Sequence, residues 1–214
     1  MKINKKLLVV TTIFILLPIL FGVFKWNELP DMIAIHWNLE GIPDGYSSKA
    51  FAVFGLPSIM AAFHILCAFG HKLDPKRENY SDKLFIFILW LCPTLSIVLS
   101  YATYAHALGY DVNVSKIVTM LMGFVFIIVG NYMPKVKQNY TMGIKIPWTL
   151  NDETNWYKTH KLAGWVWMLS GIITIICSLM NFYTIIFVVM LVSVFVPTIY
   201  SYMLYKKQEK SKNS

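Results

Sequence analysis

Six long apolar stretches divide the sequence and limit what the chain can fold into. Each approaches the roughly 20 residues with which an α-helix crosses the hydrocarbon core of a bilayer. The composition agrees, because 57% of the residues are hydrophobic and only 14% are charged. We therefore expect an all-α integral membrane protein with six transmembrane helices. Their approximate ranges are 7–26, 51–70, 84–105, 114–133, 162–180 and 183–205.

The basic residues predict how these helices are oriented. Lys25, Lys49 and Lys116 lie in loops on one side, and the other basic residues lie on the side of the two termini. Short loops rich in lysine and arginine stay in the cytoplasm. We expect a multi-pass protein of the cell membrane with both termini in the cytoplasm. Topology and anionic lipid head groups then account for the net charge of +8 without a nucleic acid partner.

Three parts follow from this layout. Residues 1–70 contain the first helix, an outer loop and the second helix. Residues 71–113 contain a cytoplasmic loop and the third helix, and residues 114–214 contain the last three helices and a basic tail.

Small residues predict close packing in the third part. The pairs Gly123 and Gly130, and Gly164 and Gly171, are each seven residues apart, so each pair lies on one face of its helix. Small residues let helix backbones approach, and we expect the fourth and fifth helices to pack closely. The fifth and sixth stretches are so near in sequence that they must form a tight antiparallel hairpin. Pro197 interrupts the sixth stretch and frees a backbone carbonyl group.

The ionisable residues argue against an ion-coupled transporter. All 11 acidic residues lie outside the six stretches, whereas pumps and ion-coupled transporters place carboxylates inside the membrane. His64 lies deep in a stretch, with Cys67 one turn later, and the two could form half of a metal site. We favour a histidine that is hydrogen-bonded to a neighbouring helix. The three cysteines lack paired loop spacing and indicate neither a disulfide framework nor a zinc site.

The loop NELPDMIAIHWNLEGIPDGYSSKAF, between the first two stretches, is expected to be a small ordered region on the outer side. Its segment MIAIHWN alternates with a period of two from Ile33 to Trp37, which indicates a short strand. The segment PDG then predicts a turn in which Gly45 adopts a positive φ. His36 and Asp44 could bind a metal ion, but two ligands without a third make a weak site. We interpret the loop as a folded lip that recognises something outside the cell.

A polar segment, IPWTLNDETNWYKTHKLAGW at residues 146–165, separates the fourth and fifth stretches. Pro147 favours extended backbone at the residue before it, and Thr149 with Asp152 three residues later resembles a capping box. We expect a helix to begin at Thr149 and to run unbroken into the fifth stretch, with its first turns at the level of the lipid head groups. Three tryptophans would then anchor it at the interface: Trp148, Trp156 and Trp165.

His160 lies in this polar segment and needs a hydrogen-bond partner. Asn131 at the end of the fourth stretch and Asp152 two turns earlier are the candidates. We interpret His160 as a residue that locks the segment rather than a catalytic one, because no nucleophile or set of metal ligands accompanies it. The chain also lacks the H-E-x-x-H and G-x-S-x-G motifs, and its histidines are scattered. We expect no enzymatic activity, no metal and no cofactor.

Two segments carry a family resemblance. LPDMIAIHWNLEGIPDGYSSK fits a pattern of L-P, then H-W-N, G, D-G and K. GNYMPKVKQNYTMGIKIPWTLNDETNWYKTHKLAG fits G-N-Y, then G-I-R-T-P-W-T-L and W-x-x-T-H-x-x-G. The second pattern resembles the most specific signature of the SdpI family of bacterial toxin-immunity membrane proteins, and the first resembles the domain of unknown function common at that family's N-terminus. The chain departs from the family at Lys145 and Ile146, where arginine and threonine are usual, and a lysine cannot reproduce the bidentate geometry of arginine.

The resemblance implies a plasma-membrane protein that protects the cell against a secreted, membrane-active peptide toxin. It also implies a second role, because the family's founding example holds a cytosolic repressor at the membrane when the toxin is engaged. The candidate toxin-binding residues in the outer loop are His36, Trp37, Asn38, Gly41, Asp44, Gly45 and Lys49. The cytoplasmic residues with structural or signalling roles are Asn131, Gly143, Lys145, Pro147, Trp148, Thr149, Asp152, Trp156, Thr159, His160 and Gly164.

Three hypotheses of function compete. In the first, the protein gives immunity by binding a secreted peptide toxin at the outer face of the membrane. In the second, it is a receptor that sequesters a cytosolic DNA-binding repressor. The immunity role and the receptor role can coexist in one protein. In the third, which we disfavour, it is a membrane enzyme. The expected partners are membrane lipid, the peptide toxin and the repressor, without direct binding of nucleic acid.

Overall fold

The computed structural model describes residues 5–79 and 82–212, and Lys2, which contributes to the predicted orientation, lies outside these ranges. Within this part of the chain, six helices are long and apolar enough to cross a membrane, as the sequence predicts. They are α1 (Lys5–Phe24), α2 (Leu56–Leu73, preceded by the π-helical turn Phe51–Gly55), α3 (Asp82–Ala107), α4 (Val114–Tyr132), α6 (Glu153–Leu179) and α7 (Tyr183–Lys212). The shorter elements are β1 (Met32–Trp37), β2 (Pro43–Ser48), the 3₁₀ turns Arg77–Asn79 and Met133–Lys135, and α5 (Pro147–Asn151).

The chain forms two compact units. The first comprises Met1–Leu73 and Asp82–Val118, and the second comprises Asp74–Ser81 and Thr119–Ser214. The loop between α2 and α3 therefore belongs to the second unit, although the two helices that it joins belong to the first.

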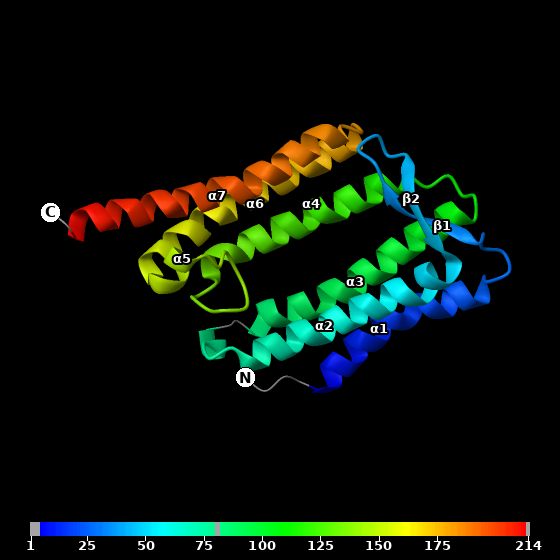
Figure 1. Cartoon of the computed structure of the whole chain (residues 1–214), viewed down its shortest axis with the longest axis horizontal. Coiled ribbons are helices and arrows are strands. Elements are labelled where there is room, and N and C mark those ends of the chain that lie inside the picture. The colour runs from blue at the N-terminus through cyan, green and yellow to red at the C-terminus, as the bar shows by residue number, and fades with distance from the viewer. Residues whose placement is uncertain (1–4, 80–81, 213–214) are drawn as a thin grey trace. The chain divides into compact units, whose positions relative to one another are not determined.

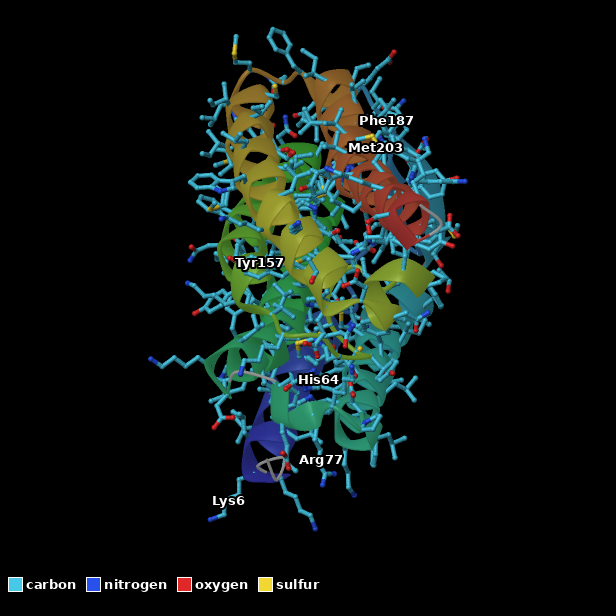
Figure 2. The ribbon with its side chains drawn as sticks, turned by 90° about the vertical axis from the view of Figure 1, so that its left-hand side faces the viewer. Lys6, His64, Arg77, Tyr157, Phe187 and Met203 are labelled. Atoms are coloured by element: carbon cyan, nitrogen blue, oxygen red, sulfur yellow. The ribbon has the colours of Figure 1, made fainter. Side chains whose placement is uncertain are left out.

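In the first unit, α1, α2 and α3 lie side by side and carry the two strands at one end (Figure 1). Polar side chains join the helices inside this bundle. Oγ1 of Thr11 lies 2.9 Å from Nε2 of His64, and Oγ of Ser96 donates to the carbonyl oxygen of Ile15 at 2.8 Å. His64 lies within the helices (Figure 2) and is buried. The prediction that His64 bonds to a neighbouring helix is confirmed.

In the second unit, α4 and α6 meet through their glycines. A Cβ atom added to Gly130 would lie 2.9 Å from the carbonyl oxygen of Gly164, and one added to Gly123 would lie 2.9 Å from that of Gly171. Real Cβ atoms do not approach backbone so closely, so a larger residue would push the helices apart. The predicted close packing of the fourth and fifth helices is confirmed.

Helices α6 and α7 form the predicted antiparallel hairpin, which appears in yellow to red (Figure 1). The turn is closed by a 2.8 Å hydrogen bond from the nitrogen of Phe182 to the oxygen of Cys177. Pro197 has no N–H group to donate to the carbonyl of Ser193 four residues earlier. The indole nitrogen of Trp167 donates to that oxygen instead, at 3.0 Å. The carbonyl that the proline frees thus links α7 to α6.

The outward faces of α6 and α7 are apolar over most of their length. Phe187 and Met203, both on α7 (Figure 2), are more than half exposed. Large exposed apolar surfaces on such helices indicate contact with lipid. These features describe a multi-pass membrane protein.

Candidate functional site

The hairpin of β1 and β2, residues 32–48, is fixed at its base by Lys49. Nζ of Lys49 donates to the carbonyl oxygen of Trp26 at 3.0 Å and lies 3.4 Å from Oδ1 of Asp31. The ammonium group also sits 5.2 Å from the centre of the Trp26 ring, and the Lys49 side chain is largely buried. Lys49 therefore makes its contacts at the end of α1 and holds the hairpin in place.

The turn of the hairpin is formed by residues 38–42, not by the segment PDG. The side-chain oxygen of Asn38 accepts hydrogen bonds from the nitrogens of Glu40 at 2.9 Å and Ile42 at 3.0 Å. Gly41 has a φ of +80°, a conformation that costs other residues steric strain. The expectation that Pro43 to Gly45 make the turn was wrong, because an asparagine that bonds its own loop supplies the turn earlier in the sequence.

Gly45 lies within β2, where it pairs with His36 across the hairpin. An added Cβ atom would lie 2.8 Å from Cβ of His36, so glycine is required by close approach rather than by a positive φ. Nδ1 of His36 lies 2.5 Å from Oδ1 of Asp44, and both side chains are exposed. Trp37 packs edge-on against His106 of α3, with ring centres 5.8 Å apart.

His36 and Asp44, which we considered as a weak pair of metal ligands, are not joined by further ligands among the described residues. Within residues 5–79 and 82–212, no group of three or more histidine, cysteine or acidic side chains is arranged to hold a metal ion. His36 and Asp44 remain an exposed pair on the surface of the hairpin.

The hairpin presents apolar side chains as well as this polar pair. Each of these apolar side chains is more than half exposed, whereas Ile33 of β1 is buried in the hydrophobic core of the first unit. They are Met32, Leu39, Ile42 and Tyr46.

The connector, residues 133–152 between α4 and α6, is organised around Trp156 and His160 of α6. Trp156 is only 2% exposed, and its indole nitrogen donates to the carbonyl oxygen of Val136 at 2.7 Å. Its ring stacks on that of His160, with centres 4.0 Å apart. The expectation that Trp156 is an interfacial anchor was wrong, because the connector folds over it. Trp165 is 61% exposed, as an interfacial residue would be.

Both ring nitrogens of His160 bond to the backbone. The nitrogen of Ile144 donates to Nε2 at 3.0 Å, and Nδ1 lies 2.8 Å from the carbonyl oxygen of Trp156. Because Nε2 accepts, it carries no proton, and Nδ1 must be the donor to Trp156. The predicted partners Asn131 and Asp152 were therefore wrong. Gly143, with a φ of +107°, brings the loop so close to the imidazole that a Cβ atom would collide with Nε2.

Thr149 and Gln138 stabilise the connector through hydrogen bonds to its own backbone. Oγ1 of Thr149 accepts from the nitrogen of Ile146 at 3.1 Å and donates to a nearby carbonyl oxygen in the same loop. The amide nitrogen of Gln138 donates to the carbonyl oxygens of Thr149 at 2.9 Å and Leu150 at 2.8 Å. Both side chains are buried. They hold α5, which starts at Pro147, against the loop.

Asp74 is a member of this network that the sequence analysis missed. Its Oδ2 accepts from the nitrogen of Tyr140 at 2.9 Å and from Oγ1 of Thr141 at 2.8 Å. Its Oδ1 accepts from the nitrogen of Lys76 at 2.8 Å, and Nζ of Lys76 donates to Oε1 of Gln138. The loop after α2 is thus hydrogen-bonded to the connector. The dipeptide Asp-Pro is a turn signal that marks Asp74 in the sequence, but its distant partner has no local signal.

Asp152 ends α5 and caps α6. Its backbone is extended, and its Oδ1 accepts from the nitrogens of Thr154 at 2.7 Å and Asn155 at 3.2 Å. The predicted unbroken helix from Thr149 was therefore wrong, since Asp152 rather than Thr149 is the cap. The side chain of Gln208 on α7 also donates to Oδ2 of Asp152.

Asn155 and Thr159 join the start of α6 to α7. The side-chain nitrogen of Asn155 donates to the carbonyl oxygen of Ser201 at 3.0 Å, and its oxygen accepts from Oγ of Ser201 at 2.6 Å. Oγ1 of Thr159 donates to the same Asn155 oxygen at 3.0 Å. All three side chains are buried.

The remaining predicted residues lie at the edges of this network. Asn131 is exposed at the end of α4, and other groups occupy both ring nitrogens of His160. Lys145 is exposed and donates to the carbonyl oxygen of Thr141 at 3.0 Å. Trp148 packs between Tyr202 and Tyr205 of α7, with ring centres at 5.5 Å and 5.8 Å. An added Cβ atom at Gly164 would meet Pro134 at the start of the connector.

Comparisons with known protein families match two segments of the chain, and these segments contain the hairpin and most of the connector. Residues 135–201 match the SdpI/YfhL protein family, and residues 13–61 match a domain of unknown function (DUF1648). Over 210 residues the chain is 28% identical to the immunity protein SdpI of Bacillus subtilis (strain 168), which covers 95% of this chain and 98% of that protein. No solved structure matches the chain. The hairpin lies within the first matched segment along the chain, and most of the connector lies within the second. The C-terminal part of the chain thus matches the SdpI/YfhL family, and the chain over nearly its whole length is similar to an immunity protein of that name.

Proposed function

We propose that this protein is an immunity protein of the cell membrane and that it engages a secreted, membrane-active peptide toxin at the hairpin. The named relative is an immunity protein, which supports the general role. The distribution of lysines supports an outer position for the hairpin, where a secreted peptide would arrive.

One observation carries the choice of the hairpin: it is fixed at its base and exposes apolar side chains near its tip. Leu39 and Ile42 are more than half exposed. Asn38 holds the turn that carries them, and Lys49 holds the base of the hairpin. A surface that is ordered before binding loses little conformational entropy when a partner docks. An apolar, membrane-active peptide offers the complementary surface.

The test is protection of a sensitive strain that expresses the full chain. The variant Leu39→Ser with Ile42→Ser should lose protection, measured as membrane potential during exposure to the secreted peptide. Tyr140→Ser, which changes an exposed aromatic residue of the connector, is the matched control and should protect as the parent does. The amount of each protein in the membrane is measured in parallel. Full protection by the double variant at parental abundance would refute the role of the hairpin.

A second candidate function is that of a receptor that sequesters a cytosolic repressor. The connector favours it, because this loop is folded by buried hydrogen bonds and still exposes Lys145 and Tyr140. A rigid, basic loop on the side of the termini would suit a soluble partner. Addition of the peptide should move a DNA-binding protein to the membrane fraction, and Lys145→Ala should weaken that recruitment. A regulator that stays soluble when the peptide is added would exclude this function.

We propose no catalytic role for His160. Both of its ring nitrogens are engaged by the backbone, so neither is available to move a proton to or from a substrate. His160→Gln should therefore lower the abundance of folded protein without changing the protection that each folded molecule gives. A variant that folds to parental abundance and gives no protection would contradict this.

A further inference from the structure

The exposed face of α6 changes from basic to apolar within one helical turn. Lys158 and Lys161 are exposed near the start of the helix, and Tyr157 and Trp165 flank them along the same face. Beyond Trp165, this face continues with exposed aliphatic side chains: Leu169, Ile172, Ile173 and Ile176. Aromatic residues concentrate where a membrane meets water, so the order of these residues places the edge of the hydrocarbon core next to Trp165.

Among the residues that the structure describes, no carboxylate is found paired with either lysine of this face. The salt bridges at Lys25 and Lys49 and the contact between His36 and Asp44 lie near the hairpin. None of them involves Lys158 or Lys161. Two ammonium groups without carboxylate partners are thus presented at the depth of the lipid head groups.

The spacing of the two lysines suits one shared anion. Residues three apart on a helix have Cβ atoms about 5–6 Å apart, so the flexible side chains of Lys158 and Lys161 can converge on a single phosphate. Trp165 follows Lys161 by four residues, which is about 6 Å along the axis. Lysine side chains can extend from such a depth toward the water, which leaves the acyl chains of a lipid beside the aliphatic residues.

The helical turns of α6 that carry the two lysines are fixed by buried contacts on their opposite face. On the opposite face of the same turns, Trp156, Thr159 and His160 are buried and hydrogen-bonded. A fixed backbone reduces the entropy that is lost when the two side chains bind one ligand.

We propose that Lys158 and Lys161, framed by Tyr157 and Trp165, form a binding site for the phosphate head group of an anionic phospholipid. The two ammonium groups bind the phosphate, the ring of Trp165 lies at the level of the glycerol, and the apolar face beyond it contacts the acyl chains. The site is separate from the hairpin and does not depend on the proposed engagement of a toxin.

The experiment measures lipid binding to the purified full chain in detergent by native mass spectrometry. Phosphatidylglycerol is the probe, and phosphatidylcholine, whose choline ammonium offsets the phosphate charge, is the reference lipid. We expect phosphatidylglycerol to bind preferentially. Lys158→Gln with Lys161→Gln should weaken its binding by about tenfold, since each lysine near a membrane surface contributes to the attraction of anionic lipid.

Lys207→Gln with Lys210→Gln is the matched control. This pair has the same spacing and loses the same charge, and both residues are exposed near the end of α7, but they lack the flanking tyrosine and tryptophan. We expect it to change binding by less than about twofold, because a tyrosine and a tryptophan do not flank these lysines as they flank Lys158 and Lys161. Lys158→Arg with Lys161→Arg should keep the preference for phosphatidylglycerol, because both positive charges remain. This variant shows that substitution at these positions does not by itself abolish binding through misfolding.

Three results would overturn the site. The first is equal loss of binding in the α6 and α7 pairs, which would indicate general charge attraction. The second is equal binding of phosphatidylglycerol and phosphatidylcholine by the parent protein. The third is displacement of the lipid by an equal concentration of inorganic phosphate, which would indicate a site for the free anion.

Discussion

The hairpin and the connector differ in where the polar side chains of their motifs form hydrogen bonds. In the hairpin, His36 and Asp44 pair on the surface. In the connector, Thr149 and His160 are buried and bonded to backbone groups. Buried polar groups that are fully bonded define a unique local structure, whereas exposed groups are available to partners. The comparison indicates that the connector motif mainly maintains a fold and that the hairpin is better suited to recognition.

The largest effect that would test this comparison is expected at Trp156. Trp156→Ala removes a buried indole and its bond to the Val136 carbonyl, so the free energy of unfolding should fall by about 3–5 kcal/mol. The measurement is denaturation of the purified protein in detergent. Trp165→Ala, at an exposed position of the same helix, is the control and should cost less than about 1 kcal/mol. Equal losses in the two variants would contradict the buried role of Trp156.

The next largest effect is expected at Asp74. Asp74→Ala leaves the donors at Tyr140 and Thr141 without their carboxylate partner, and an unpaired buried donor costs about 1–3 kcal/mol. The same denaturation assay should show this loss. Asp111→Ala removes an exposed carboxylate and should be nearly neutral. If Asp74→Ala is also neutral, the loop after α2 does not support the connector.

A smaller and local effect is expected in the hairpin at Gly41. Gly41→Ala places a side chain at a φ of +80°, which costs about 1–2 kcal/mol. Hydrogen exchange at the amide of Ile42, which is bonded to Asn38, should become faster while exchange in α2 stays unchanged. Gly70→Ala, where an added Cβ atom meets nothing within 4 Å, is the control and should leave the hairpin protected. Unchanged exchange at Ile42 in Gly41→Ala would argue against the turn described above.

The smallest effect on stability is expected at the exposed pair. His36→Ala should change the free energy of unfolding by less than about 1 kcal/mol, because both side chains of the pair are exposed to solvent and such surface contacts contribute little. Protection against the peptide should nevertheless fall if the hairpin recognises it. If His36→Ala lowered the free energy of unfolding as much as Trp156→Ala does, the hairpin pair would be as important for stability as the buried contacts of the connector.

Much of the fold could be predicted because it depends on local periodicity and composition. The six helices, the strand at MIAIHWN and the glycine contacts between α4 and α6 all follow from spacing along the chain. The His64 contact followed from the cost of an unpaired polar group in a membrane. These features need no knowledge of the path that the loops take.

The candidate sites were harder to predict because their contacts depend on loops. His160 bonds to Ile144 only because Gly143 turns the chain toward the imidazole. Trp156 fits the pattern of an interfacial residue until the connector folds over it. The turn at Asn38 competes with an equally plausible turn signal at Asp44, and spacing alone does not decide between them.

Photo-crosslinking of the peptide tests the central claim most directly. A photoreactive amino acid replaces either Ile42 in the hairpin or Tyr140 in the connector, both exposed positions, and cells that produce each variant are exposed to the secreted peptide and illuminated. The account predicts a crosslinked product of protein and peptide from position 42 and none from position 140. A product from position 140 alone, or none from position 42 in a variant that still protects the cell, would contradict it.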